Sequence, residues 1–231
     1  MNSIFLALEQ LRTQLSQALH ATPGIRHFDV SFPLNDAFDP LAWLGAQQCY
    51  PQFYWQQRNG DEELAALGAV ITFSSLALAT QFLREQNAAG DTRICGLNAF
   101  NPEQGSLFLP RLLWRRTAGT ATLRLQLWSD YSLQEDAHAA RDFLQQLQPA
   151  RPIRPLAVQV EHENHQPQRA EWLKLVRRAT ETIARGDFEK VVLARATDLQ
   201  FTQRINPVAL MAASRALNLH CYHFCMVFDA S

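Results

Sequence analysis

The stretch LFLPRLLWRRTAGTATLRLQLWS, residues 107–129, predicts two adjacent strands that are joined by a turn at Ala118-Gly119. In its second half, Leu123, Leu125 and Leu127 share one face of a strand, and polar residues between them share the other face. This alternation is typical of an antiparallel sheet with one buried face.

Working outward from this pair, hydrophobic periodicity and capping residues predict further strands and helices. The predicted strands cover residues 25–32, 51–58, 64–73, 93–100, 188–201 and 219–228, and the predicted helices cover residues 4–19, 39–44, 74–83, 132–148, 172–186 and 206–217. This order favours an α+β fold with antiparallel or mixed sheets and flanking helices, although the last strand, helix and strand could by themselves form a parallel unit.

A change in composition divides the chain. Residues 149–168 contain four prolines and few large apolar side chains, so we interpret them as a connector. The connector separates an N-terminal α+β region, residues 1–148, from a second region, residues 169–231.

Charge and composition exclude several classes of protein. The chain has 21 Lys+Arg against 22 Asp+Glu and a net charge of -1, which argues against a dedicated nucleic-acid binder. Its four cysteines are too sparse for a disulfide framework, so we interpret them as reduced thiols. The N-terminus does not resemble a signal peptide, and no apolar run reaches the ~18 residues of a membrane span. We therefore expect a cytoplasmic protein that does not enter a membrane.

Only two lysines occur, and one of them is a candidate for chemistry. Lys174 lies on a predicted helix, where a solvated position explains it. Lys190 lies near the start of the strand predicted over residues 188–201 and shares a face with Val192 and two alanines. An amine held against such a face loses solvation, which favours its neutral form and makes it a usable general base. In the alternative, Lys190 extends to water at the strand end.

Longer stretches carry a resemblance. The segment KVVLAR, residues 190–195, after a helix that ends near Gly186, resembles the lysine-bearing strand of the chorismate-utilising enzymes. The stretches ATPGIR (21–26), YPQFYWQQRNGDEE (50–63), GLNAF (96–100) and MAASR (211–215) extend this resemblance over essentially the whole chain. Within the family, the chain is most similar to members that make isochorismate for menaquinone biosynthesis.

The resemblance implies a magnesium-dependent isomerisation, in which water adds to C2 of chorismate while the C4 hydroxyl leaves. Lys190 matches the family's general base, which activates that water. Family members that use ammonia instead typically lack lysine at this position. Two alternatives stay open: a salicylate synthase, which shares the lysine base before it eliminates pyruvate, and a non-catalytic remnant that serves as an interaction module.

Family members continue beyond residue 231 for about as much chain again, so the resemblance implies an N-terminal half in truncated form. Residues 169–231 would then be the start of the family's catalytic domain. The general acid and the magnesium-binding glutamates of the family would lie in the absent half. We therefore expect this chain to be inactive by itself. Strand edges left without their partners would also favour self-association.

A second candidate is the alternation of Cys221, His223 and Cys225, which raises the question of a zinc site. Ligands two residues apart on a flat strand are ~6.5–7 Å from one another, too far for one ion with bonds of ~2.0–2.3 Å. Core cysteines and a hydrogen-bonded histidine are the better interpretation.

The remaining polar residues are interpreted as structural. His162 and His165 lie in the polar connector and are expected to be solvated. Arg115 and Arg116 are expected to be a surface pair, with a carboxylate-binding role left open. Arg195 is expected to form a structural salt bridge, because it points away from Lys190 if the strand is regular.

Overall fold

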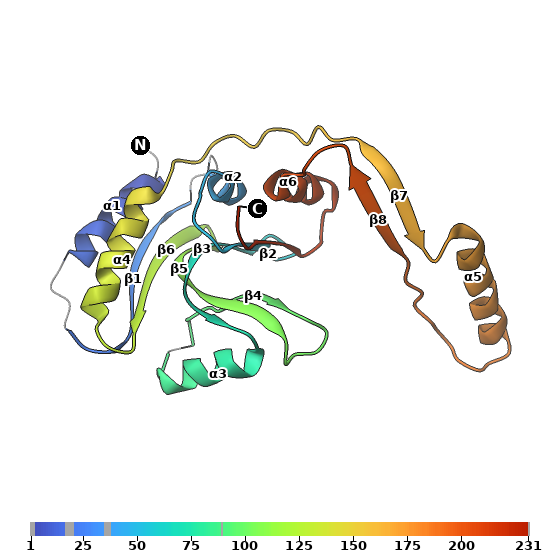
Figure 1. Ribbon diagram of the computed structural model, residues 1–231, viewed down its shortest axis with the longest axis horizontal. Helices are drawn as coiled ribbons and strands as arrows, with labels where there is room; N and C mark the ends of the chain where they lie inside the picture. Colours follow the sequence, from blue (N-terminus) through green and yellow to red (C-terminus); the bar gives the residue numbers. More distant parts are fainter. Residues whose placement is uncertain (1–2, 17–20, 35–37, 89, 231) are drawn as a thin grey trace. The chain divides into compact units, whose positions relative to one another are not determined.

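The computed structural model describes residues 3–16, 21–34, 38–88 and 90–230 (Figure 1). The chain divides into two compact units. The first unit comprises Met1–Pro155 with Pro207–Ser231, and the second comprises Leu156–Asn206. The expected connector at residues 149–168 stays a prediction. The last helix and the last strand of the chain belong to the same unit as its N-terminal part.

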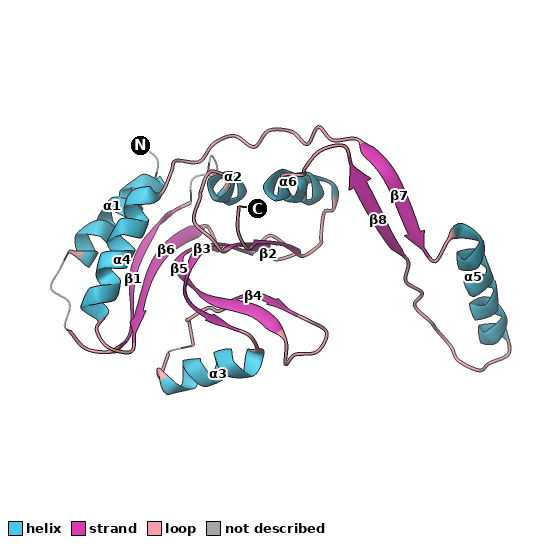
Figure 2. Ribbon diagram, viewed as in Figure 1, coloured by secondary structure: helices cyan, strands magenta, loops and turns pink. Residues whose placement is uncertain are grey.

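The first unit combines helices with one large antiparallel sheet (Figure 2), and the predicted α+β class is confirmed. Its helices are α1 (Ser3–Leu15), α2 (Pro40–Gly45), α3 (Leu76–Glu85), α4 (Leu133–Gln146) and α6 (Pro207–Leu217). Its strands are β1 (Gly24–Pro33), β2 (Gln52–Gln56), β3 (Glu62–Phe73), β4 (Cys95–Asn98), β5 (Gly105–Thr117), β6 (Thr120–Ser129) and β9 (His223–Val227). The strand order is β1-β6-β5-β3-β2-β9, and β4 pairs with β5 outside this path.

The hairpin of β5 and β6 lies where residues 107–129 predicted it. Thr117 pairs with Thr120, and the two residues between them, Ala118 and Gly119, have φ values of 46° and 81°. Positive φ at both central residues matches the right-handed twist of the flanking strands. The turn therefore sets the register that aligns the two strands.

The leucine face of β6 forms the centre of the core. Leu123, Leu125 and Leu127 are each 0% exposed, as their alternation predicted. Helices α1 and α4 lie side by side over β1 and β6 (Figure 1) and cover this face. Each fully buried leucine contributes ~1.5–3 kcal/mol relative to an exposed one. This layer therefore holds the two helices on the sheet.

The start of α4 differs from the predicted capping box. Ser132 is the N-cap residue, but its side chain accepts no hydrogen bond from the helix. Its own backbone N–H donates to Oγ of Ser129 at 2.9 Å. In a capping box, the side chain of Glu135 would accept a hydrogen bond from this N–H. Ser129 accepts it instead, so the predicted capping box is wrong. In contrast, Asp39 caps α2 as predicted, since its side chain accepts from the N–H of Leu41.

The C-terminal strand completes the sheet of the first unit. β9 pairs antiparallel with β2, with Cys225 opposite Tyr54. The alternative of a parallel unit over residues 188–228 is wrong, because the two strands in that range belong to different sheets and both pair antiparallel. β9 also forms one edge of the described sheet. Self-association through such an edge stays a prediction.

The second unit consists of a hairpin and a helix. Strands β7 (Val160–Gln166) and β8 (Ala196–Phe201) pair antiparallel, and α5 (Arg169–Ala184) lies between them in sequence. β7 occupies part of the expected connector, where ring atom Nδ1 of His165 lies 2.9 Å from Oγ1 of Thr197. Sequence patterns did not predict this strand, because β7 is polar along its length. Its pairing with β8 is made mostly by the backbone.

None of the described helices is long and apolar enough to cross a membrane.

Gly96 in β4 tests the packing of this strand on β5. Its φ is +143°, and a Cβ atom there would lie 2.1 Å from the carbonyl oxygen of Ser106. We expect Gly96→Ala to lower the free energy of unfolding by about 1–3 kcal/mol more than Gly24→Ala. Gly24 is the matched control, because it has φ +129° and open space around the added atom. Urea unfolding measures the difference, and equal losses would contradict the close approach of β4 to β5.

Candidate functional site

Lys190 lies in the second unit, between α5 and β8. Residues 188–195 have no regular secondary structure, so the strand predicted from residue 188 begins only at Ala196. Lys190 is exposed, and Val192 is 80% exposed. The apolar strand face expected around Lys190 is therefore not formed within the described unit. Its role as a general base stays a prediction.

Two other charged residues of the second unit, Arg195 and Lys174, form no ion pair with a described residue. Arg195 forms no ion pair with any residue that the structure describes, so the salt bridge predicted for it is wrong. Lys174 is exposed on α5, in agreement with its interpretation as a solvated residue. In the described structure, water therefore reaches Lys190 freely.

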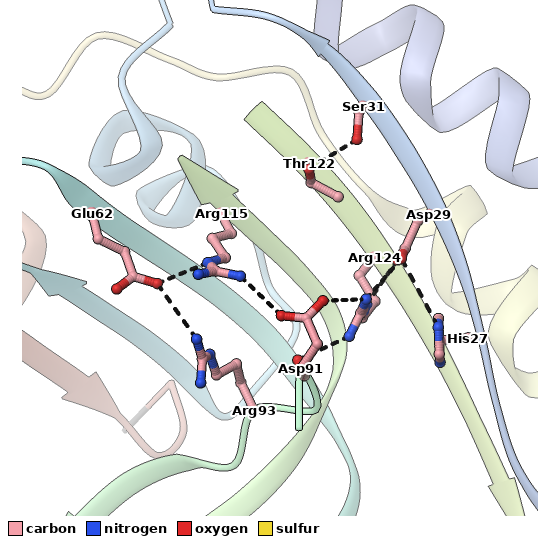
Figure 3. A network of polar contacts seen from close by, with 9 residues as sticks. All are labelled: His27, Asp29, Ser31, Glu62, Asp91, Arg93, Arg115, Thr122 and Arg124. Atoms are coloured by element: carbon pink, nitrogen blue, oxygen red, sulfur yellow. Dashed lines mark hydrogen bonds and ion pairs between the residues drawn. The ribbon is translucent and has the colours of Figure 1, made fainter. Parts of the chain in front are cut away.

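A network of charged side chains lies on the sheet of the first unit (Figure 3). The guanidinium of Arg124 on β6 donates two hydrogen bonds of 2.7 Å to the carboxylate of Asp29 on β1. It also donates to Oδ2 of Asp91 at 2.9 Å. The hydrogen bonds to Asp29 raise the pKa of Arg124 above its ordinary value. Such charge-assisted, bidentate bonds are among the strongest polar contacts in proteins.

Asp91 links this pair to the neighbouring strands. Its Oδ1 accepts from Arg115 at 3.0 Å, and Arg115 also donates to Glu62 at 2.8 Å. Arg93 approaches the same Glu62 carboxylate at 3.9 Å. Asp29, Asp91 and the three arginines of this network line a pocket of about 230 Å³, and each guanidinium contacts a carboxylate (Figure 3). The network holds the segment around Asp91 on the sheet, so Arg115 of the predicted surface pair has a structural role.

A second network joins α6 to the sheet. The hydroxyl of Tyr54, which is 1% exposed, donates to Oε1 of Glu63 at 2.6 Å. Nη1 of Arg215 on α6 donates to the Tyr54 oxygen at 3.0 Å and to Glu63 at 3.3 Å. Glu63 also accepts from Arg116. Burial, followed by the charge of Glu63, raises the pKa of Tyr54 above its ordinary value.

Arg215 reaches a third element through its other nitrogen. Nη2 lies 3.2 Å from Oδ2 of Asp39, whose other oxygen caps α2. One guanidinium thus connects α6 with α2, β2 and β3. Sequence reasoning missed these contacts, because Arg215 and Asp39 are 176 residues apart and no local pattern relates them.

The cysteines and histidines near β9 form no metal centre. Among residues 3–16, 21–34, 38–88 and 90–230, no three His, Cys, Asp or Glu side chains are grouped so that they could hold a metal ion. The magnesium ion that the family resemblance implies therefore finds no ligand set in this part of the chain.

The predicted environments of these residues are only partly correct. Cys225 packs against the core, and burial raises the pKa of its thiol. Cys221 is exposed, so it is not the core cysteine that was expected. His223 is buried, but its side chain forms no hydrogen bond with a described residue, and that prediction is wrong as well.

Comparison with known proteins gives a consistent result along the whole chain. A family model described as "Chorismate binding enzyme" matches residues 13–230. Isochorismate synthase MenF of Escherichia coli (strain K12) is 56% identical over 229 residues, which are 99% of this chain and 53% of that protein. Isochorismate synthase MenF of Pasteurella multocida is 30% identical over 221 residues, which are 94% of this chain and 50% of that protein.

The fold shows the same likeness. The solved structure of the menaquinone-specific isochorismate synthase MenF from Escherichia coli matches with a TM-score of 0.89 and 55% sequence identity. The match covers 99% of this chain and 54% of that chain. The chain thus spans about half the length of the relatives that it matches.

The raised pKa of Tyr54 predicts a loss of stability at alkaline pH. Above about pH 10, the tyrosine of the unfolded chain loses its proton while folded Tyr54 keeps its own, so unfolding becomes easier as the pH rises. In Tyr54→Phe, the fall in the free energy of unfolding should be smaller by about 1.4 kcal/mol per pH unit in that range. Urea unfolding at a series of pH values measures this slope.

Tyr131→Phe is the control for this prediction, because Tyr131 is 81% exposed. It should leave the alkaline slope unchanged. An alkaline slope in Tyr54→Phe equal to that of the wild type would show that the buried hydroxyl does not resist ionisation.

Proposed function

The chain belongs to the chorismate-binding enzymes, and on this premise we propose that it takes part in the conversion of chorismate to isochorismate. The observation that carries the proposal is the 56% identity to isochorismate synthase MenF of Escherichia coli over 99% of the chain. Because the chain spans about half of that protein, the proposal assigns it one part of the machinery. Menaquinone biosynthesis in the cytoplasm is the setting proposed for it.

Lys190 is the residue proposed to act on water. In this reaction, the oxygen of a water molecule bonds to C2 of the ring, the double bonds shift, and the bond between C4 and its hydroxyl oxygen breaks. A neutral amine at Lys190 would accept the proton that the attacking water releases. Lys190 forms no hydrogen bond or ion pair with any described residue, so no described contact competes with this role. The neutral amine requires apolar surroundings that the described unit does not form around Lys190.

Two further requirements of the reaction are not assigned to residues of this chain. The departing hydroxyl needs a proton donor, and the family resemblance implies a magnesium ion. The described residues offer no ligand set for such an ion, and no step proposed here is routed through it. We therefore expect no isochorismate formation by the 231-residue chain alone.

A chimera tests the proposal. The chain replaces the part of MenF from Escherichia coli that it matches, and the rest of MenF is retained. We expect this chimera to form isochorismate, and we expect Lys190→Ala to lower kcat about 10²–10⁴-fold, the range for loss of a general base. Lys174→Ala is the matched control and should keep full activity, because this exposed lysine lies on α5.

The products of the chimera separate the alternatives. Chromatography separates isochorismate from chorismate, and mass spectrometry identifies salicylate by its lower mass. Salicylate as the main product would favour the alternative function, a salicylate synthase. A folded chimera that forms neither product would favour a non-catalytic module. A Lys190→Ala chimera with kcat close to that of its parent would remove Lys190 from the mechanism.

A further inference from the structure

A second pocket of the first unit lies between the β2–β3 turn and the connection from α6 to β9. Its volume is about 320 Å³, within the size range of small-molecule sites. The residues that line it are Gln56, Gln57, Arg58, Asn59, Gly60, Arg215, Leu219, His220, Cys221 and His223. None of the functions assigned above uses this pocket.

The charge of its lining distinguishes this pocket from the one at Arg124. Asp29 and Asp91 line the pocket at Arg124 and neutralise its guanidinium groups. The lining of the second pocket contains two arginines and two histidines but no aspartate or glutamate. The described lining therefore favours an anion over a cation.

His223 provides one available donor in the lining of the pocket. It lies on β9 opposite Gln56, and it is 7% exposed. Its ring forms no hydrogen bond or ion pair with any described residue, although it lines the pocket. Among the described residues, the buried side-chain atoms without a hydrogen-bond partner are Nε of Arg12 and Nε1 of Trp114, so the ring nitrogens of His223 are open to the pocket. An anion in the pocket can therefore accept a hydrogen bond from this imidazole.

Arg58 provides a second available donor. It is exposed in the β2–β3 turn and forms no ion pair within the described part of the chain. Arg215 differs, because its two terminal nitrogens already donate to Tyr54, Glu63 and Asp39. Direct contacts to a ligand are therefore available mainly from Arg58 and His223.

We propose that this pocket binds a small anion with a carboxylate or phosphate group through Arg58 and His223. The guanidinium of Arg58 can donate two parallel hydrogen bonds to either group, and an N–H of His223 can donate a third. The side-chain amides of Gln57 and Asn59 line the same space. The anion would connect the β2–β3 turn with the start of β9, so its binding would stabilise the edge of the sheet. This proposal is independent of Lys190.

The test uses the 231-residue chain labelled with ¹⁵N-histidine. Benzoate and inorganic phosphate are titrated separately at constant ionic strength, and the ring resonances of His223 are followed by NMR. We expect a saturable shift with at least one anion, and the anion that saturates identifies the class of ligand. Protection of the β9 amides from hydrogen exchange should increase on binding, because the ligand bridges to the β2–β3 turn.

Variants decide whether the proposed residues bind the anion. Arg58→Ala should raise the dissociation constant at least about tenfold, as expected for loss of charge-assisted hydrogen bonds. Arg58 is exposed in a turn, so this variant is expected to fold even if His223→Gln does not. Arg154→Ala removes an exposed arginine elsewhere and should leave the dissociation constant unchanged.

Three results would overturn the proposal. The first is the lack of a saturable shift with either anion. The second is an equal loss of affinity in Arg58→Ala and Arg154→Ala, which would indicate a general charge effect. The third is a dissociation constant in Arg58→Ala that equals that of the wild type.

Discussion

The guanidinium of Arg215 holds the C-terminal part of the first unit to its sheet. It donates to Tyr54 and Glu63 on two neighbouring strands and to Asp39 at the start of α2. Tyr54 and Glu63 are buried, so removal of Arg215 would leave their polar groups without this partner. This interaction, the packing of Val208 in the core and the pairing of β9 with β2 together position α6 and the path of the chain into β9.

Placement of α6 and β9 also creates the pocket beside the β2–β3 turn. This pocket and the pocket at Arg124 both contain arginines but differ in charge balance. At Arg124, carboxylates from separate segments neutralise the guanidinium groups, and the contacts serve the fold. Beside Arg58 and His223 no carboxylate lines the space. This difference in charge balance explains why the pocket at Arg124 is interpreted as structural and the pocket at Arg58 and His223 as a binding site.

Local patterns predicted the elements whose cause is local. Leu123, Leu125 and Leu127 are fully buried as their alternation indicated, and Asp39 caps the helix that it precedes. The prediction failed around Lys190, where the β-branched residues suggested a strand that the described unit does not form. Strand propensity depends on neighbours that cover the strand, and here Val192 has few such neighbours in its own unit.

The sequence by itself determined the fold class, the β5–β6 hairpin and the family, since alternation, turn residues and long matching stretches are all properties of the chain order. Only the tertiary structure decided that β9 joins β2 and that Arg215 meets Asp39 across 176 residues. The same holds for the pocket between the β2–β3 turn and the start of β9. These features depend on which distant segments pack together, and packing is a property of the whole folded chain.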